Sequence, residues 1–199
     1  MVIIYQQMLR IGIMSIVLTV FALADAGADV VTDWNERAGE IVVSAQMGPL
    51  PAERVLAMVQ ASVYEAVNAI TRRYPVTDLE LEAASGASME AAVAAANHAV
   101  LTELVPSHRS AVDRLYQTAL AAIADGAAKV GGVVVGEQAA AAILARRTHD
   151  GAETGESYRP STNAGTYVPT VVPETPQWRY RRPWLMTGPA QFRPGPPRS

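Results

Sequence analysis

Apolar residues recur at helical spacing along most of the chain between residues 29 and 148. The clearest pattern lies in residues 52–74, where apolar residues follow one another at steps of four and three, which places them on one face of an α-helix. They are Val55, Val59, Val63, Val67 and Ile70. The polar residues of this segment fall mostly on its other faces: Glu53, Arg54, Gln60, Glu65, Asn68 and Arg72. Pro75 favours an end of the helix at the preceding residue.

The same kind of pattern predicts four further helices, over residues 29–45, 88–104, 107–124 and 127–148. Breaks that contain Pro or Gly separate the helices. Ser88 is suited to cap the helix over residues 88–104 and Ser107 the helix over residues 107–124, because a serine hydroxyl accepts a hydrogen bond from the first-turn N–H groups. The sequence therefore predicts an all-α fold, with a bundle of about five helices over residues 29–149.

Three glycines interrupt the last of these helices. Gly131, Gly132 and Gly136 each weaken it by roughly 1 kcal/mol relative to alanine. We expect them to be tolerated because another helix crosses closely at that point. A phosphate-binding loop is a poorer explanation, because the segment lacks the Lys-Ser/Thr pair of such loops and does not join a strand to a helix.

The character of the chain changes at Asp150. Nine of the 13 prolines fall between Pro160 and Pro197, and no helical or strand period persists. The net charge changes from −6 over residues 29–150 to +3 over residues 151–199. A structureless stretch of this length is unusual inside a compact domain. Residues 150–199 are therefore predicted to be an extended Pro-rich segment, or a linker to a second helical bundle.

Residues 1–28 have the pattern of an export signal. The apolar stretch Ile11–Ala24 is 14 residues long, whereas a membrane-spanning helix needs about 20. Ala26-Gly27-Ala28 suits cleavage by signal peptidase. We therefore expect a mature chain that is exported to the periplasm or the cell exterior, with an uncleaved membrane anchor as the alternative.

Composition removes several classes of function. Half of the residues are apolar, and the net charge is −3. Because binding to nucleic acid needs a basic face, we expect no such partner. The chain has no cysteine, which excludes disulfides, thiolate metal sites and a cysteine nucleophile.

No candidate group has the spacing of an active site. His98, His108 and His149 lie at unrelated positions, without a second ligand one helical turn away, so a metal site is not indicated. Asp150, Glu153 and Glu156 faintly resemble a calcium loop but lack its alternating ligands, and an ordinary solvated loop is the preferred interpretation. No serine lies in a nucleophile motif. We therefore predict no catalytic, cofactor-binding or metal-binding residue in this chain.

The most distinctive local cluster is Trp178-Arg179-Tyr180-Arg181-Arg182-Pro183-Trp184. Arginines between aromatic rings can hold an anion or stack on a base. In an acidic chain we prefer another interpretation, in which the tryptophans pack on the helices and the arginines stay solvated.

Four segments, in order, resemble the N-terminal half of the bacterial vanadium-dependent haloperoxidases, which are related to type-2 phosphatidic acid phosphatases and bacterial acid phosphatases. The segments are residues 31–35 (VTDWN), residues 51–70 (PAERVLAMVQASVYEAVNAI), residues 122–151 with their Arg147-Thr-His-Asp-Gly end, and residues 183–197 with Pro183-Trp184 and Gln191-Phe-Arg-Pro. The second segment is similar to a family helix that usually has histidine at the position of Gln60 and aspartate at that of Glu65.

The resemblance implies a mostly helical fold, and in complete members a second helical bundle that holds vanadate or phosphate. That bundle carries a Lys followed by Arg-Pro, a Pro-Ser-Gly-His segment, and an Arg with a downstream His. This sequence contains none of these, since Lys129 is followed by Val-Gly-Gly and there is no Ser-Gly-His. No catalytic residue carries over, and vanadate or phosphate is expected only in a complete member.

Two hypotheses of different classes follow. In the first, the chain is a truncated or split haloperoxidase-like protein that carries the non-catalytic helical half and is inactive alone. Its partner would be a second helical half, or another copy of itself through an exposed apolar face. In the second, it is a stand-alone exported helical binding or scaffold module. A membrane partner is expected only if the signal stays uncleaved.

Overall fold

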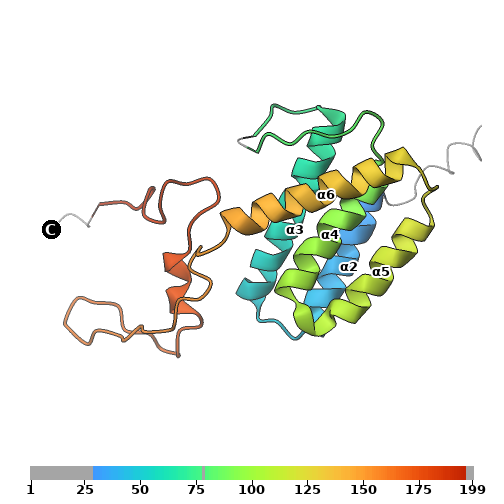
Figure 1. Ribbon diagram of the computed structural model, residues 1–199. Coiled ribbons are helices and arrows are strands. Elements are labelled where there is room, and N and C mark those ends of the chain that lie inside the picture. Colours follow the sequence, from blue (N-terminus) through green and yellow to red (C-terminus); the bar gives the residue numbers. More distant parts are fainter. Residues whose placement is uncertain (1–28, 78, 196–199) are drawn as a thin grey trace, which may run out of the picture.

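A computed structural model describes residues 29–77 and 79–195, and these residues form an all-α structure (Figure 1). The α-helices are α2 (Val30–Ser44), α3 (Pro49–Thr71), α4 (Met89–Leu104), α5 (Arg109–Ala121) and α6 (Ala127–Arg146). Two short 3-10 helices, η1 (Pro106–His108) and η2 (Pro176–Tyr180), complete the helical elements of the described residues, which contain no strand. The predicted all-α class and the five predicted helices are confirmed. The predicted signal at residues 1–28 lies outside the described residues.

Helix ends follow local hydrogen bonds. Ser88 accepts a hydrogen bond from the Ala91 N–H at 3.1 Å, as predicted for an N-cap. The N-cap predicted at Ser107 is wrong, because residues 106–108 form η1 and α5 begins only at Arg109. Helix α3 ends three residues earlier than predicted, since the Asn68 side chain binds the Tyr74 N–H and C=O and turns the chain away.

Helix α3 also begins earlier than predicted. Pro49 occupies the first helical position and Pro51 lies in the first turn. Proline is tolerated there because the first N–H groups of a helix have no partner within it. Residues 49–51 therefore belong to the first turn of α3, and residues 45–48 alone connect α2 to α3.

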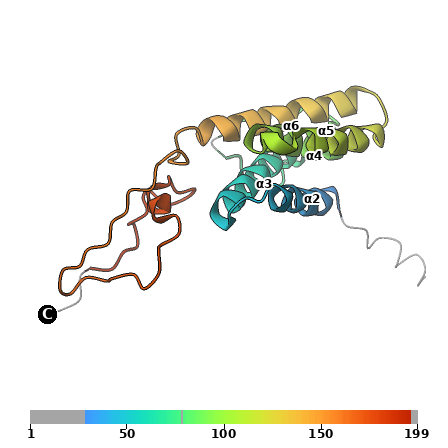
Figure 2. The same cartoon turned by 90° about the horizontal axis from the view of Figure 1, so that it is seen from below.

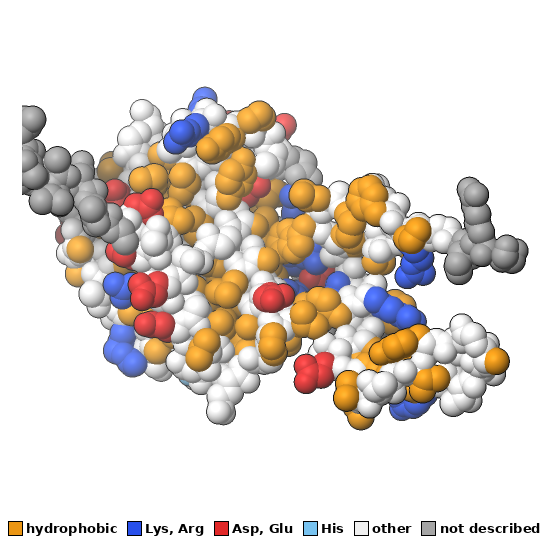
Figure 3. Space-filling view, turned by 180° about the vertical axis from the view of Figure 1, so that it is seen from behind, with side chains coloured by type: hydrophobic (Ala, Val, Ile, Leu, Met, Phe, Trp, Pro, Cys, Tyr) orange, Lys and Arg blue, Asp and Glu red, His pale blue; other side chains and the backbone are white. Residues whose placement is uncertain are grey.

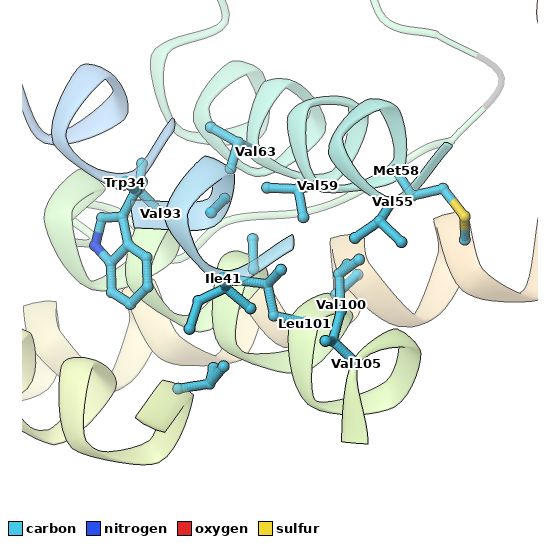
Figure 4. Packing of buried hydrophobic residues seen from close by; sticks show 14 of the residues in the cluster. Trp34, Ile41, Val55, Met58, Val59, Val63, Val93, Val100, Leu101 and Val105 are labelled. Carbon is cyan, nitrogen blue, oxygen red and sulfur yellow. The ribbon is translucent and has the colours of Figure 1, made fainter. Parts of the chain in front are cut away.

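Helix α4 lies in the middle of the bundle, with α6 on one side and α2 on the other (Figure 2). Its residues from Ala91 to Asn97 are all buried. The main core gathers side chains of α2, α3, α4, α5 and α6, including Val112 and Ile143. Figure 4 shows Trp34, Met58, Val59 and Leu101 in this core. A second, smaller cluster joins α3, α4 and α6 through Ala66, Ala92, Val135 and Ala139.

The predicted close crossing at the glycines of α6 is confirmed. A Cβ added at Gly132 would lie 2.9 Å from the Ala91 Cβ, and one at Gly136 would lie 2.9 Å from the Ala95 Cβ. Both would also come closer than 3.0 Å to backbone carbonyl oxygens of α4, those of Ser88 and Ala92. Because backbone cannot move aside as a flexible side chain can, only glycine allows this contact.

Among the described residues, α6 is the helix that is long and apolar enough to cross a membrane by length and composition alone. The packing of α6 against α4 also explains why α6 is apolar, since small and apolar residues line the contact between the two helices.

Beyond α6 the chain leaves the bundle. The segment from Asp150 to Gly195 lies past the C-terminal end of α6, beside the bundle, and η2 is its one helical element (Figures 1 and 2). We call residues 150–195 the C-terminal segment. Its exposed apolar side chains include Tyr167, Val172, Leu185 and Phe192.

The crossing of α4 and α6 gives the first testable prediction. Gly136→Ala should lower the free energy of unfolding by about 1–3 kcal/mol, because overpacking against the Ala92 carbonyl outweighs the roughly 1 kcal/mol of helix propensity that alanine adds. Gly39→Ala in α2 is the matched control, since a Cβ there has nothing within 4 Å, and it should be neutral or stabilising. Urea unfolding of both variants makes the comparison, and equal stabilisation by both changes would contradict the close crossing.

Candidate functional site

A buried carboxylate joins the bundle to the C-terminal segment. The Asp150 side chain is 0% exposed, and its Oδ2 accepts hydrogen bonds from Arg54 Nε at 2.8 Å and Arg147 Nε at 3.0 Å. Arg181 Nη1 lies 3.5 Å from Oδ1, which also accepts from the Ala152 N–H at 3.1 Å. We call Asp150, Arg54, Arg147 and Arg181 the Asp150 cluster.

Three parts of the chain meet in the Asp150 cluster. Arg54 comes from the second turn of α3, Arg147 is the C-cap of α6, and Arg181 follows η2. Gly151, with φ +92°, turns the chain directly after the carboxylate, and a Cβ there would lie 3.0 Å from the Tyr180 carbonyl oxygen. The turn allows Asp150 to face back towards the helices.

The charges of the cluster shift its protonation equilibria. Burial by itself raises the pKa of Asp150, but hydrogen bonds and positive charges from Arg54 and Arg147 outweigh it and hold that pKa below its usual value. Burial and the neighbouring Arg54 charge lower the pKa of Arg181, but a guanidinium keeps its proton in proteins at neutral pH. Asp150 is therefore ionised, and the cluster carries a net charge of about +2.

The same arginines hold the backbone of the C-terminal segment. Arg147 donates from Nη2 to the Arg182 carbonyl at 2.7 Å and from Nη1 to the Pro183 carbonyl at 3.3 Å. The Arg182 N–H donates to the Asp150 carbonyl at 2.9 Å. Figure 3 shows charged side chains gathered in the junction between the bundle and this segment. The arrangement attaches residues 181–183 to the ends of α3 and α6.

The arginines of residues 178–184 are not all solvated, which differs from the interpretation preferred from the sequence. The Arg181 guanidinium lies 4.1 Å from the centre of the Trp178 ring, and that of Arg147 lies 4.4 Å from the centre of the Trp184 ring. The prediction of solvated arginines is wrong for Arg181, whose side chain is only 14% exposed, because its charge is paired with Asp150. Arg179 and Arg182 are exposed, as predicted.

A second buried carboxylate lies on α3. Glu65 is 9% exposed, whereas the helical pattern placed it among the solvent-facing residues. Its two oxygens lie 3.0 and 2.9 Å from Thr77 Oγ1. Glu65 and Thr77 line two cavities, one of about 570 Å³ beside the end of α3 and one of about 550 Å³ that reaches Arg182 and Trp184.

The three histidines lie apart. His98 Nε2 is 2.7 Å from Asp113 Oδ1 and its ring stacks on Tyr116, which joins α4 to α5. His108 contacts Ser107, and His149 Nδ1 lies 3.6 Å from Glu153 on the surface.

The faint calcium pattern is not assembled. Asp150 faces arginines, while Glu156 binds the Tyr158 N–H and Arg159. Among residues 29–77 and 79–195, no three His, Cys, Asp or Glu side chains form a group that could hold a metal ion.

Sequence reasoning missed both buried carboxylates. Asp150 was considered only as a loop ligand, and Glu65 and Arg54 were placed on the polar faces of α3. The signals in the sequence were two charged stretches within the resembling segments, Arg147-Thr-His-Asp150-Gly and Glu53-Arg54. However, Arg54 and Asp150 are 96 positions apart, and the periodicity of apolar residues does not predict contacts over such a separation.

Comparison with known proteins adds no relative: no family model, no curated protein and no solved structure matches this chain.

The Asp150 cluster predicts a large stability effect. Asp150→Asn should lower the free energy of unfolding by about 3–5 kcal/mol, because one buried and two partly buried guanidinium groups lose their counter-charge. The matched control is Asp125→Asn, which removes the same charge from an exposed ion pair with Lys129 and should have little effect. Chemical denaturation of the two variants provides the measurement, and similar values for both would contradict the assignment.

The lowered pKa of Asp150 also predicts a pH dependence. The ionised carboxylate contributes its full stability above its unfolded-state pKa of about 3.9, and this contribution is lost as the pH falls through the lower folded-state pKa. Thermal unfolding between pH 6 and pH 2 should show an acid loss of stability that is smaller in Asp150→Asn. An unchanged acid slope in that variant would show that other carboxylates dominate.

Proposed function

We propose that this chain is the non-catalytic, N-terminal helical half of an exported protein related to the vanadium-dependent haloperoxidases and acid phosphatases. In this role it binds no vanadate or phosphate itself. It provides a helical bundle and an attached C-terminal segment on which a second, oxyanion-binding helical half would dock.

One observation carries the proposal: the four resembling segments are linked in space as a continuous series of contacts. Asn35 of the first segment accepts a hydrogen bond at 2.8 Å from Gln60 of the second. Arg54 of the second segment pairs with Asp150 of the third. Arg147 of the third segment binds the Pro183 carbonyl and stacks on Trp184 of the fourth. Motifs that resembled a family only by their order are therefore also neighbours in the fold.

The exposed side chains of the C-terminal segment support a docking role. Trp184, Leu185, Met186 and Phe192 are 46%, 98%, 42% and 77% exposed. These four exposed apolar side chains lie within nine residues of the chain, and exposed apolar surface of this kind favours contact with another protein. The Asp150 cluster holds the backbone beside Trp184, which would reduce the ordering cost of such contact.

A stand-alone exported binding or scaffold module is the second candidate. The observation that favours it is the attachment itself, because ion pairs within this one chain already hold residues 181–183 on the bundle. In that case the exposed apolar residues would contact another copy of the chain or a different protein, with no catalysis involved.

A chimaera tests the proposal. Residues 29–195 would be joined to the second helical half of a complete bacterial vanadium-dependent haloperoxidase, reconstituted with orthovanadate and assayed for bromide oxidation by hydrogen peroxide. We expect no activity from residues 29–195 alone, and more activity from the chimaera than from the second half alone, because docking orders the vanadate site.

The controls separate misfolding from a wrong assignment. Circular dichroism checks that the chimaera is folded, and vanadium NMR checks that it retains vanadate. A folded, vanadate-loaded chimaera without any gain over the second half alone would contradict the proposal and favour the stand-alone module.

A further inference from the structure

The cavity beside the C-terminal end of α3 is lined by more acidic than basic side chains. Its volume of about 570 Å³ lies within the range of small-molecule sites, roughly 300–1,000 Å³. Among the described residues, three carboxylates line it, those of Glu65, Glu80 and Glu82, against one guanidinium, that of Arg72. The described lining therefore carries a net charge of about −2.

The carboxylate of Glu65 lies deep in this lining and is incompletely paired. Thr77 Oγ1 is within hydrogen-bond distance of both oxygens, but a hydroxyl has one hydrogen and can satisfy only one of them. Within the part of the chain that the structure describes, no other donor reaches Glu65 and no Lys, Arg or His forms an ion pair with it. A charge that is nine-tenths buried without a counter-charge is costly.

At Asp150, the positive charges that compensate a buried carboxylate come from arginines of the same chain. Three arginines surround Asp150, whereas Glu65 has only a neutral hydroxyl. The second cavity at Glu65 is lined by Arg146, Arg147 and Arg182. Arg147 is bound to Asp150 and to two backbone carbonyls, and within the part of the chain that the structure describes no arginine of this cavity lies within ion-pair distance of Glu65. The cavity beside α3 is the one whose described lining is net acidic, so a cationic ligand is expected on that side.

We propose that the cavity beside α3 binds an organic cation, a primary ammonium group on a short apolar chain, with the ammonium group at Glu65. An ammonium group has three hydrogens and can donate one to the oxygen that Thr77 leaves unsatisfied. The Tyr74, Leu79 and Leu81 side chains in the lining suit a methylene chain, and Glu80 and Glu82 suit a second ammonium group. A linear diamine is the ligand class that matches all three features.

Putrescine is the probe for this site. Isothermal titration of the purified chain with putrescine chloride should give saturable binding, while sodium chloride at the same ionic strength and the dianion succinate should not. Heats for putrescine that equal those for sodium chloride would overturn the proposal. The measurement does not depend on a second helical half, so its result is independent of the proposed haloperoxidase relationship.

Two variants of one helix locate the ligand. Glu65→Gln keeps the shape of the side chain and should weaken putrescine binding at least about tenfold, since it removes the partner of a buried charge. Glu53→Gln removes an exposed charge of α3 outside the cavity and should leave the affinity unchanged. An equal loss of affinity in both variants would mean that putrescine binding depends only on the net charge of the protein, and would overturn the proposed site at Glu65.

Stability gives a second, ligand-free measurement. Without putrescine, Glu65→Gln should raise the Tm, because it removes an uncompensated buried charge, whereas a carboxylate with a purely structural role would make the same change destabilising. If Glu65→Gln does not fold, the double variant Glu80→Gln/Glu82→Gln tests the acidic lining without changing the core. That variant should weaken putrescine binding, and unchanged affinity would overturn the two-ended site.

Discussion

The close crossing of α4 and α6 determines where the C-terminal end of α6 lies, and with it the position of Asp150 and of the C-terminal segment. Gly132 and Gly136 leave room for the α4 backbone, so α6 lies directly on the alanine-rich face of α4 and also contacts α3. This places the C-terminal end of α6 near the second turn of α3, where Arg54 lies. A bulkier residue at either glycine would move that end, and Asp150 with it, away from its partner.

The ion pairs at that end extend the order of the bundle into a segment that has almost no helix of its own. Asp150 alone would be a costly buried charge, and the three arginines alone would repel one another. Together, the carboxylate offsets part of the arginine charge, and the arginines also donate to several backbone carbonyls, so most of the polar atoms of this network are paired. The aromatic rings of Trp178 and Trp184 cover two of the guanidinium groups.

The two buried carboxylates have different roles for this reason. Asp150 is neutralised within the chain and joins the bundle to the C-terminal segment, as the proposed half of a larger protein would need. Glu65 has a hydroxyl partner, forms no ion pair with another described residue, and borders two cavities, which is the basis of the proposed ligand site. The same helix, α3, thus contributes Arg54 to an internal attachment and Glu65 to a candidate ligand site.

The sequence by itself determined the five helices, their ends to within three residues, and the close approach at the glycines, because apolar periodicity, caps and glycine act over neighbouring residues. It also contained four segments that resemble one family, and those segments contact one another in series in the fold. It did not indicate that Arg54 meets Asp150, that Arg181 is largely shielded from solvent by its pairing with Asp150, or that Glu65 lines cavities. Those facts depend on how α6 crosses α4 and where the chain returns after η2, and only tertiary packing brings such distant residues within hydrogen-bond distance.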